Sequence, residues 1–247
     1  MTDFAALADA AWPPLERAEL GGWRLRFAGG VTKRANSAWA GGADDLDGLD
    51  PAASLEALAA VEHAYRERGL PPLFQLSGAD GDARAQLIGR GYRAIDETLV
   101  LAASVSPSPP VSGVEIADAP SDEWIAVWWA VDGRGGTAEL AIARRILTGV
   151  PALYAGLRRD GVLVSVARLA LVGSWGGLYC VATLPKCRRR GFGERVVAAV
   201  LAAGAERGVT DAWLQVLARN AGAIALYERF GFAEVDRYSY LWVEICS

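Results

Sequence analysis

The spacing of hydrophobic positions predicts a chain that mixes helices and strands throughout its length. Apolar–polar alternation and short apolar runs indicate strands, and apolar residues at steps of three and four indicate helices. In the first half this predicts a short helix within 3–20 around Pro13-Pro14, strands 23–27 and 33–39, helix 54–68, strand 74–76, helix 83–90 and strand 99–102. In the second half it predicts strand 113–117, helices 121–131 and 138–148, strands 152–157, 162–171 and 175–183, helix 193–206, strand 213–217, helix 221–229 and strand 234–244.

One segment interrupts this pattern and divides the chain. Residues 104–112 contain three prolines and four serines, a composition typical of a linker. We therefore predict an N-terminal domain over 1–103, a linker over 104–112 and a second domain over 113–247.

The two halves share short sequence features at the same offset. Gln75 lies in Phe-Gln-Leu and Gln215 in Leu-Gln-Val, and Gly91-Tyr92 follows a predicted helix as Gly231-Phe232 does. The interpretation is a duplicated α/β unit. The first half has an acidic segment, 47–51, before its long helix, so we expect no anion site there.

The second half carries the more informative junction between a strand and a helix. An apolar strand ends before Pro185, three arginines follow at 188–190, and Gly191 and Gly193 precede a helical pattern. A helix start offers unpaired N–H groups, glycines allow close approach, and arginines add charge, so the segment suits a pyrophosphate. The alternative is a tight turn with a solvated basic face. The residues match neither a P-loop nor the three-glycine dinucleotide fingerprint.

Composition narrows the possible functions. The chain of 247 residues has a net charge of −4, which disfavours general nucleic-acid binding. Its three cysteines lack ligand spacing, and its single histidine, His63, makes a His-based zinc site or a Ser-His-Asp triad improbable. No leader or membrane span is visible, so we expect a cytoplasmic protein without a metal.

The basic glycine loop and a downstream segment resemble the GNAT acetyltransferase superfamily. Arg188 to Gly193 is similar to that family's Arg/Gln-x-x-Gly-x-Gly/Ala loop, and 214–232, with Asn220, Ala-x-x-Leu-Tyr and Gly-Phe, is similar to its second motif. The resemblance implies an α/β fold with a mixed (α+β) sheet. Because the first half matches only as a degenerate copy, it further implies two GNAT-like units in tandem.

The resemblance also implies acetyl-CoA as acyl donor and assigns residues to it. The backbone of three residues would pair with the pantetheine arm: Val181, Ala182 and Thr183. The loop and helix start would hold the pyrophosphate: Arg188, Arg189, Arg190, Gly191, Phe192, Gly193 and Glu194. Asn220 would hydrogen-bond the donor, or cap a helix, or both. Tyr227 would protonate the leaving thiolate, with a half-buried aromatic anchor as the alternative.

The acceptor side departs from the family pattern. Many members have Glu where this chain has Gln215, and a glutamine cannot take the amine proton. Glu123, Asp132 and Glu139 lie in the region that usually flanks the acceptor, although solvated helix charges are the simpler interpretation. Two further features could line an acceptor site: the tryptophan cluster Trp124, Trp128 and Trp129, and the polar run Lys33 to Ser37, which is otherwise an exposed edge strand.

These observations predict an N-acetyltransferase that moves an acetyl group to a primary amine of a small molecule or peptide by direct attack. The partners expected are that amine, with neither nucleic acid nor membrane, in a monomer or homodimer. The first alternative is a non-catalytic acyl-CoA-binding sensor or scaffold, motivated by Gln215. The second alternative is an anion-binding module independent of coenzyme A.

Overall fold

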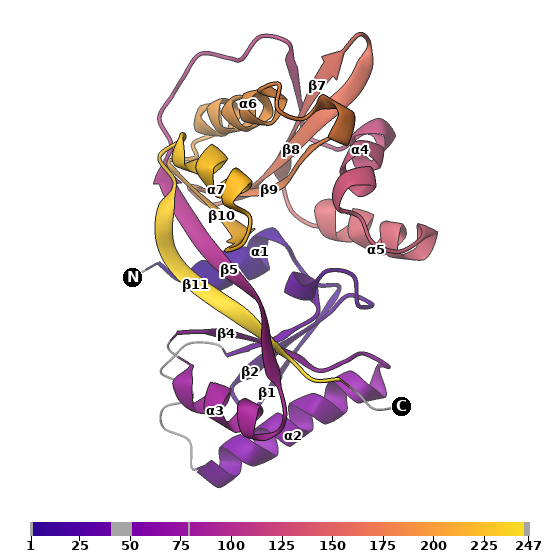
Figure 1. Cartoon of the computed structure of the whole chain (residues 1–247), viewed down its shortest axis with the longest axis vertical. Coiled ribbons are helices and arrows are strands. Elements are labelled where there is room, and N and C mark those ends of the chain that lie inside the picture. Colours follow the sequence, from indigo (N-terminus) through magenta and orange to yellow (C-terminus); the bar gives the residue numbers. More distant parts are fainter. Residues whose placement is uncertain (1, 41–50, 79, 245–247) are drawn as a thin grey trace. The chain divides into compact units, whose positions relative to one another are not determined.

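A computed structural model describes residues 2–40, 51–78 and 80–244, in which helices and strands are interspersed along the chain (Figure 1). The helices are α1 Phe4–Ala11, α2 Pro51–Glu67, α3 Gly81–Gly89, α4 Asp122–Asp132, α5 Thr137–Leu147, α6 Phe192–Glu206 and α7 Ala221–Glu228. The strands are β1 Glu16–Leu20, β2 Trp23–Phe27, β3 Ala38–Ala40, β4 Leu73–Ser77, β5 Arg93–Ser104, β6 Val114–Ala117, β7 Ala152–Arg159, β8 Val162–Val172, β9 Trp175–Thr183, β10 Asp211–Leu217 and β11 Ala233–Trp242. The predicted mixture of helices and strands is confirmed.

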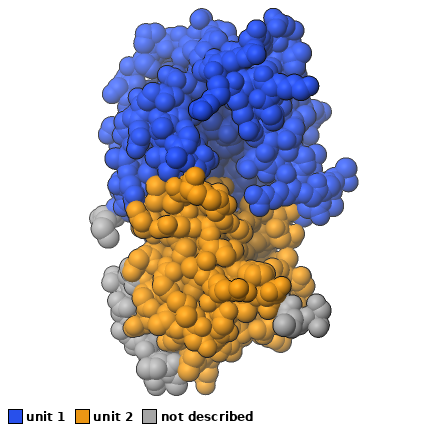
Figure 2. All heavy atoms as spheres, in the orientation of Figure 1, with its two compact units in different colours: residues 1–13, 100–216, 220–235 blue, residues 14–99, 217–219, 236–247 orange. Residues whose placement is uncertain are grey.

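The chain forms two compact units, coloured separately in Figure 2. Unit 1 comprises 1–13, 100–216 and 220–235, and unit 2 comprises 14–99, 217–219 and 236–247. The chain therefore passes between units after Pro13, within β5, on both sides of 217–219 and within β11. Helix α1 is part of unit 1 and therefore groups with the second half of the sequence. The predicted linker over 104–112, with a domain on each side, stays a prediction.

The sheet of unit 1 has the strand order β5-β10-β9-β8-β7-β6. Neighbours from β6 to β9 pair antiparallel, and β9 pairs parallel to β10. Tyr154, Arg168 and Tyr179 lie opposite one another on one face, which α1 and α4 cover. Leu153, Leu169 and Leu178 lie opposite one another on the other face, which α6 covers (Figure 1). Because both faces are covered, β8 is buried along most of its length.

Unit 2 repeats the same pairing in a smaller sheet. Strands β1, β2 and β3 pair antiparallel in order, β3 pairs parallel to β4, and the end of β11 pairs antiparallel to β4. Its core includes Trp23, Phe27, Tyr65 and Phe74, which are all buried. The unit is therefore built around an aromatic core of its own.

Two predicted elements of the first half are wrong. The segment 33–39 is not one strand: Lys33–Ala35 is a 3-10 turn, and only Ala38–Ala40 is a strand. The cause is Asn36, whose Oδ1 accepts from the N–H groups of Ala28 and Gly30 at 2.8 Å each and holds the chain in a loop.

The predicted helix within 3–20 is also different. Helix α1 ends at Ala11, before Pro13-Pro14, and Glu16–Leu20 is a strand paired with β2. Proline lacks the N–H that continues a helix, so the helix ends ahead of the pair. The acidic segment 47–50 lies outside the described residues. Over the described ranges, no helix combines the length and apolar character that crossing a membrane requires.

Candidate active site

Strand β9 carries a β-bulge where it approaches the basic loop. Val166 pairs with Ala182 and Arg168 pairs with Tyr179, so two residues, Cys180 and Val181, lie opposite one on β8. Cys180 has a φ of 55°, which a residue other than glycine rarely adopts. Such bulges bend a strand and increase its twist, and they are common beside active sites. The sequence pattern predicted the strand but gave no sign of the bulge.

Just before the bulge, β9 and β10 part. Their parallel pairing runs from Trp175 with Asp211 to Leu178 with Leu214, and within the described residues no pairing continues past that point. Val181, Ala182 and Thr183 therefore present a strand edge that β10 does not fill. An extended ligand could add to this edge as another strand would.

The segment after β9 has the predicted order of strand, loop and helix. Pro185–Cys187 forms a 3-10 turn, Arg189 and Gly191 take left-handed backbone with φ of 63° and 74°, and α6 starts at Phe192. A Cβ built on Gly193 would lie 3.5 Å from Thr183 Oγ1 and 3.9 Å from Leu226 Cδ2. The end of β9, the start of α6 and helix α7 thus converge around the loop.

The loop presents a run of unpaired backbone donors. Within the described residues, none of the N–H groups from Arg189 to Glu194 has a hydrogen-bond acceptor; the next, that of Arg195, donates to Gly191 O at 3.1 Å. Helix starts leave such donors, and here the glycine-containing loop extends the run. Together with the helix dipole, this arrangement can hold a multivalent anion.

The arginines of the loop have different partners. Arg188 Nε donates to Thr183 O at 3.2 Å and so ties the loop back to β9. Arg189 and Arg190 are exposed and donate to no described residue, which leaves their guanidinium groups available to a ligand. Glu194 forms a 3.0 Å ion pair with Arg229, so its carboxylate is partly neutralised beside the unpaired donors. The guanidinium group of Arg159 lies 6.0 Å from the centre of the Phe192 ring.

The second sequence motif forms helix α7. Asn220 is its N-cap: Oδ1 accepts from the N–H of Ala223 at 3.2 Å, which confirms the capping interpretation. Tyr227 lies on the same helix, is 9% exposed, and packs edge-on against Phe232 with ring centroids 6.1 Å apart. The anchor interpretation of Tyr227 thus holds; its role as proton donor stays a prediction.

The residues that the sequence placed near the acceptor do not include a general base. Gln215 on β10 is half-buried, and its Oε1 is buried without a donor among the described residues. Arg158 forms an ion pair with Glu123 at 2.6 Å. The hydrogen bond from Arg158, and after it the hydrogen bond from the N–H of Leu163, lower the pKa of Glu123. Glu139 accepts from the N–H of Gly136 at 2.7 Å as a helix cap, and hydrogen bonds from its own backbone N–H and that of Gly136 lower its pKa. Asp132 is exposed, so none of the three is a poised base.

The tryptophan cluster is mainly core. Trp124 is buried and donates to Ala155 O at 2.9 Å, and Trp128 is buried against Trp12 with ring centroids 6.3 Å apart. Trp129 is half-buried. Two further buried residues pack beside this cluster: Trp12 and Arg168. The sequence pattern did not indicate them, because their neighbours in the structure are distant in the sequence. Within the described residues, no group of three or more His, Cys, Asp or Glu side chains could hold a metal ion.

Comparison with known proteins gives three kinds of match. A family model described as "Probable histone acetyltransferase Rv0428c C-terminal" matches residues 3–241. "Uncharacterized N-acetyltransferase YobR" of Bacillus subtilis is 26% identical over 243 residues, which is 95% of each chain. Two solved structures share the fold. One is a GCN5-related N-acetyltransferase from Kribbella flavida (TM-score 0.73, 20% identity, 100% of this chain and 97% of that chain). The other is a tandem GNAT protein from the clavulanic acid biosynthesis pathway (TM-score 0.63, 14% identity, 99% and 88%).

Proposed function

We propose that this chain, which belongs to the Rv0428c C-terminal family and is an acetyltransferase of the GNAT type, moves the acetyl group of acetyl-CoA to a primary amine. The acceptor class that we propose is a small molecule or a peptide. The description of the matched family as a probable histone acetyltransferase favours an amine on a polypeptide.

The observation that carries the proposal is the run of unpaired N–H groups from Arg189 to Glu194. A diphosphate fits this run because it offers several anionic oxygens to converging donors. The exposed guanidinium groups of Arg189 and Arg190 add positive charge, and Gly191, which has left-handed backbone, places no side chain beside these donors. An exposed basic turn would satisfy these donors with water alone.

The residues around the loop complete the proposed donor site. The free edge of Val181, Ala182 and Thr183 would pair with the pantetheine arm, and Asn220 would orient it. When bound, acetyl-CoA supplies a thioester carbonyl that an amine can attack with loss of the thiolate. Tyr227 is proposed to donate its Oη proton to that sulfur. Backbone N–H groups of β9 would polarise the carbonyl.

Removal of the amine proton is not assigned to a side chain of this protein. Gln215 occupies the position where a Glu would act, and an amide cannot accept the proton. We propose that the acceptor reacts as the neutral amine and that its proton passes to water. The specific observation that favours the second candidate, a non-catalytic acyl-CoA sensor, is the same glutamine, whose Oε1 has no donor among the described residues.

We further propose that the chain arose by tandem duplication, with a degenerate first copy. The senses of strand pairing from β1 to β4 match those from β7 to β10. The helix pairs α2 with α6 and α3 with α7 keep the offset of Gln75 from Gln215. In the first copy the side-chain amide oxygen of Gln75 accepts a hydrogen bond from Arg26 Nη2 at 2.9 Å. The two copies therefore differ in the hydrogen bonding of this glutamine.

Calorimetry with coenzyme A tests the donor site. Gly191→Val places a branched side chain at a φ of 74° beside the unpaired donors. Gly161→Val is the matched control, because Gly161 has a φ of 79° in the β7–β8 turn and, like Gly191, no atom within 4 Å of a Cβ built on it. We expect Gly191→Val to weaken coenzyme A binding at least ~10-fold, which corresponds to about 1.4 kcal/mol. Gly161→Val should leave coenzyme A binding unchanged.

The same titration separates the alternatives. No heat with coenzyme A in the unmodified protein contradicts the donor site. Binding without release of free coenzyme A across a panel of amines and amino-terminal peptides favours the sensor. Binding together with amine-dependent release supports the transferase.

A further inference from the structure

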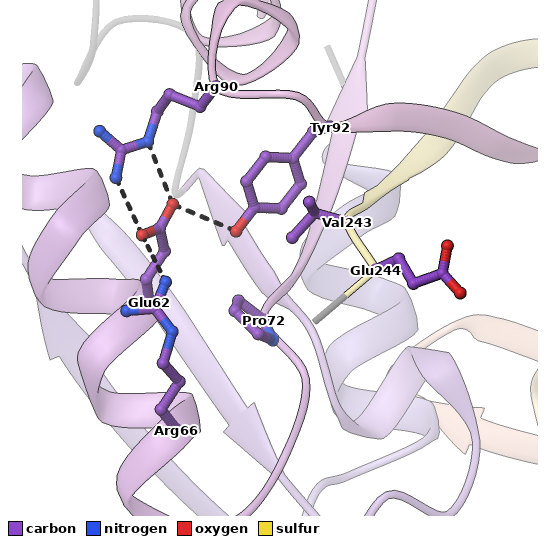
Figure 3. A pocket seen from close by; sticks show the side chains of 7 residues that line it. All are labelled: Glu62, Arg66, Pro72, Arg90, Tyr92, Val243 and Glu244. Carbon is purple, nitrogen blue, oxygen red and sulfur yellow. Dashed lines mark hydrogen bonds and ion pairs between the residues drawn. The ribbon is translucent and has the colours of Figure 1, made fainter. Parts of the chain in front are cut away.

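Unit 2 contains a charged cavity that plays no part in the proposed transfer (Figure 3). It measures about 330 Å³ and lies between α2, the turn after α3 and the end of β11. Its polar wall is formed by Glu62 and Arg66 from α2 and by Arg90 and Tyr92. Pro72 and Val243 provide an apolar wall.

Glu62 organises the polar wall. Its side chain is only 7% exposed, and both oxygens are fully engaged. Oε1 accepts from Arg90 Nε at 3.1 Å and from the Tyr92 hydroxyl at 3.2 Å. Oε2 accepts from Arg66 Nη2 and Arg90 Nη2 at 2.8 Å each. Burial raises the pKa of Glu62 and these donors lower it, with a net lowering, so the carboxyl is ionised at neutral pH.

Two arginines share this one carboxylate, which leaves positive charge and donors to spare. Within the described residues, the side chains of Arg66 and Arg90 donate only to Glu62, so Arg66 Nε and Nη1 and Arg90 Nη1 have no acceptor. Both arginine side chains are in contact with solvent, with 52% of Arg66 and 33% of Arg90 exposed. Glu244 at the rim is 75% exposed and lies 3.9 Å from Arg93. Against Glu62 alone the two arginines leave one positive charge, and Glu244, the second carboxylate of the lining, lies at the exposed rim.

Unit 1 has a cavity at the corresponding position, and it is not charged. Its wall contains Ala202 and Phe230, which keep the same offset from Glu62 and Arg90 that Gln215 has from Gln75. Phe232 likewise corresponds to Tyr92. This cavity measures about 170 Å³. The fold thus tolerates apolar residues at each of these positions, and buried ion pairs are in general a weak source of stability. The charges in unit 2 call for another explanation.

We propose that the cavity of unit 2 binds a small organic molecule with a single carboxylate, independently of acetyl transfer. The spare N–H groups of Arg66 and Arg90 hold the two carboxylate oxygens, since guanidinium groups match that geometry. Pro72, Val243 and the ring of Tyr92 contact the apolar part of the ligand. A single unbalanced charge and the nearby Glu244 favour a monoanion over a phosphate. The volume lies at the small end of ligand pockets.

Titrations without coenzyme A test this site. The probes are benzoate, a C4–C6 alkyl monocarboxylate series and inorganic phosphate, and calorimetry measures the binding of each. We expect at least one monocarboxylate to bind and inorganic phosphate to bind at least tenfold more weakly. Arg66→Gln should weaken the carboxylate at least tenfold. Arg237→Gln is the matched control in the same unit, because Arg237 is 54% exposed and paired with one glutamate, and it should leave binding unchanged.

A second variant separates binding from folding. Glu62→Ala/Arg90→Phe/Tyr92→Phe installs the residues of the unit 1 cavity, and we expect it to fold and to lose carboxylate binding. Three results overturn the proposal: no carboxylate in the series binds the unmodified protein, phosphate binds more tightly than the carboxylates, or Arg66→Gln and Arg237→Gln weaken binding equally. Gly191→Val should retain carboxylate binding, so failure of the donor site and failure of this site are distinguishable.

Discussion

The indole ring of Trp12 stacks on the phenol ring of Tyr179, with ring centroids 5.3 Å apart and planes inclined by 30°. Trp12 directly follows α1 at the start of the chain, and Tyr179 lies on β9 just before the bulge. Between them and Tyr154 lies the fully buried Arg168, whose guanidinium is 5.7 Å from the Trp12 ring and donates to Ala11 O at 3.2 Å. The first residues of the chain therefore close the core beside the candidate site.

Replacing Trp12 should strongly destabilise unit 1. Trp12→Ala removes a side chain that is 2% exposed and admits water to a buried charge. We expect a loss of about 4 kcal/mol in the free energy of unfolding, at the upper range of large-to-small core changes. Urea denaturation followed by fluorescence measures it. Trp129→Ala, at a half-buried position, should cost much less; equal losses would show that the stack contributes nothing specific.

Removing the hydroxyl of Tyr227 should slow the reaction without preventing donor binding. Tyr227→Phe keeps the edge-on contact with Phe232 but cannot donate a proton. We expect kcat to fall by roughly 10²–10⁴-fold, the range for general acids, while the Kd for coenzyme A stays within twofold. Steady-state release of free coenzyme A and calorimetry give the two values. Release at the unmodified rate would remove Tyr227 from the chemistry.

The ion pair between Glu194 and Arg229 should tune donor affinity. Glu194 places a negative charge in the first turn of α6, where the anion is expected, and Arg229 compensates it at 3.0 Å. Arg229→Gln should weaken coenzyme A binding several-fold, and Glu194→Gln should strengthen it. Charges within a Debye length of about 8 Å at physiological salt interact measurably, so both effects should shrink in 1 M salt. Salt-independent changes would indicate a steric cause.

Asp96 should make stability depend on acid pH. Lys33 and then Arg219 hydrogen-bond its carboxylate and lower its pKa, and Arg219 Nη1 lies at 2.7 Å. A lowered folded-state pKa gives stability that is complete above the unfolded value of about 3.9 and is lost as pH falls through the folded value. Asp96→Asn should therefore cost about 1 kcal/mol at pH 7 and flatten the stability profile below pH 4.

Asparagine is the right substitute at this position because Asp96 has a φ of 51°, and asparagine tolerates left-handed backbone. Asp96→Ala should cost more, since it adds backbone strain to the lost ion pairs. If Asp96→Asn has the same acid profile as the unmodified protein, the carboxylate makes no net contribution. Urea denaturation from pH 3 to pH 7 provides the comparison.

The sequence by itself determined the elements whose cause is local. Pro185, the left-handed Gly191 and the apolar spacing of 196–205 fix the order of strand, loop and helix wherever the segment lies in the fold. Asn220 caps its helix through the N–H of Ala223, three residues away. Asp160 and Gly161, both with positive φ, close the β7–β8 hairpin, a turn that Asp-Gly dipeptides favour. The resemblance to the acetyltransferase family rested on the basic glycine loop and on the segment around Asn220, and the family match confirms it.

Only the tertiary structure decided the features whose partners are far apart in the sequence. The bulge at Cys180 depends on register with β8, and the helix at the N-terminus joins unit 1 through Trp12 and Tyr179. The end of β11 pairs with β4 of the first half, and Lys33 to Ser37 form a turn because Asn36 binds the backbone of 28–32. Hydrophobic spacing records which side of an element is buried, but it carries no information about which distant segment buries it.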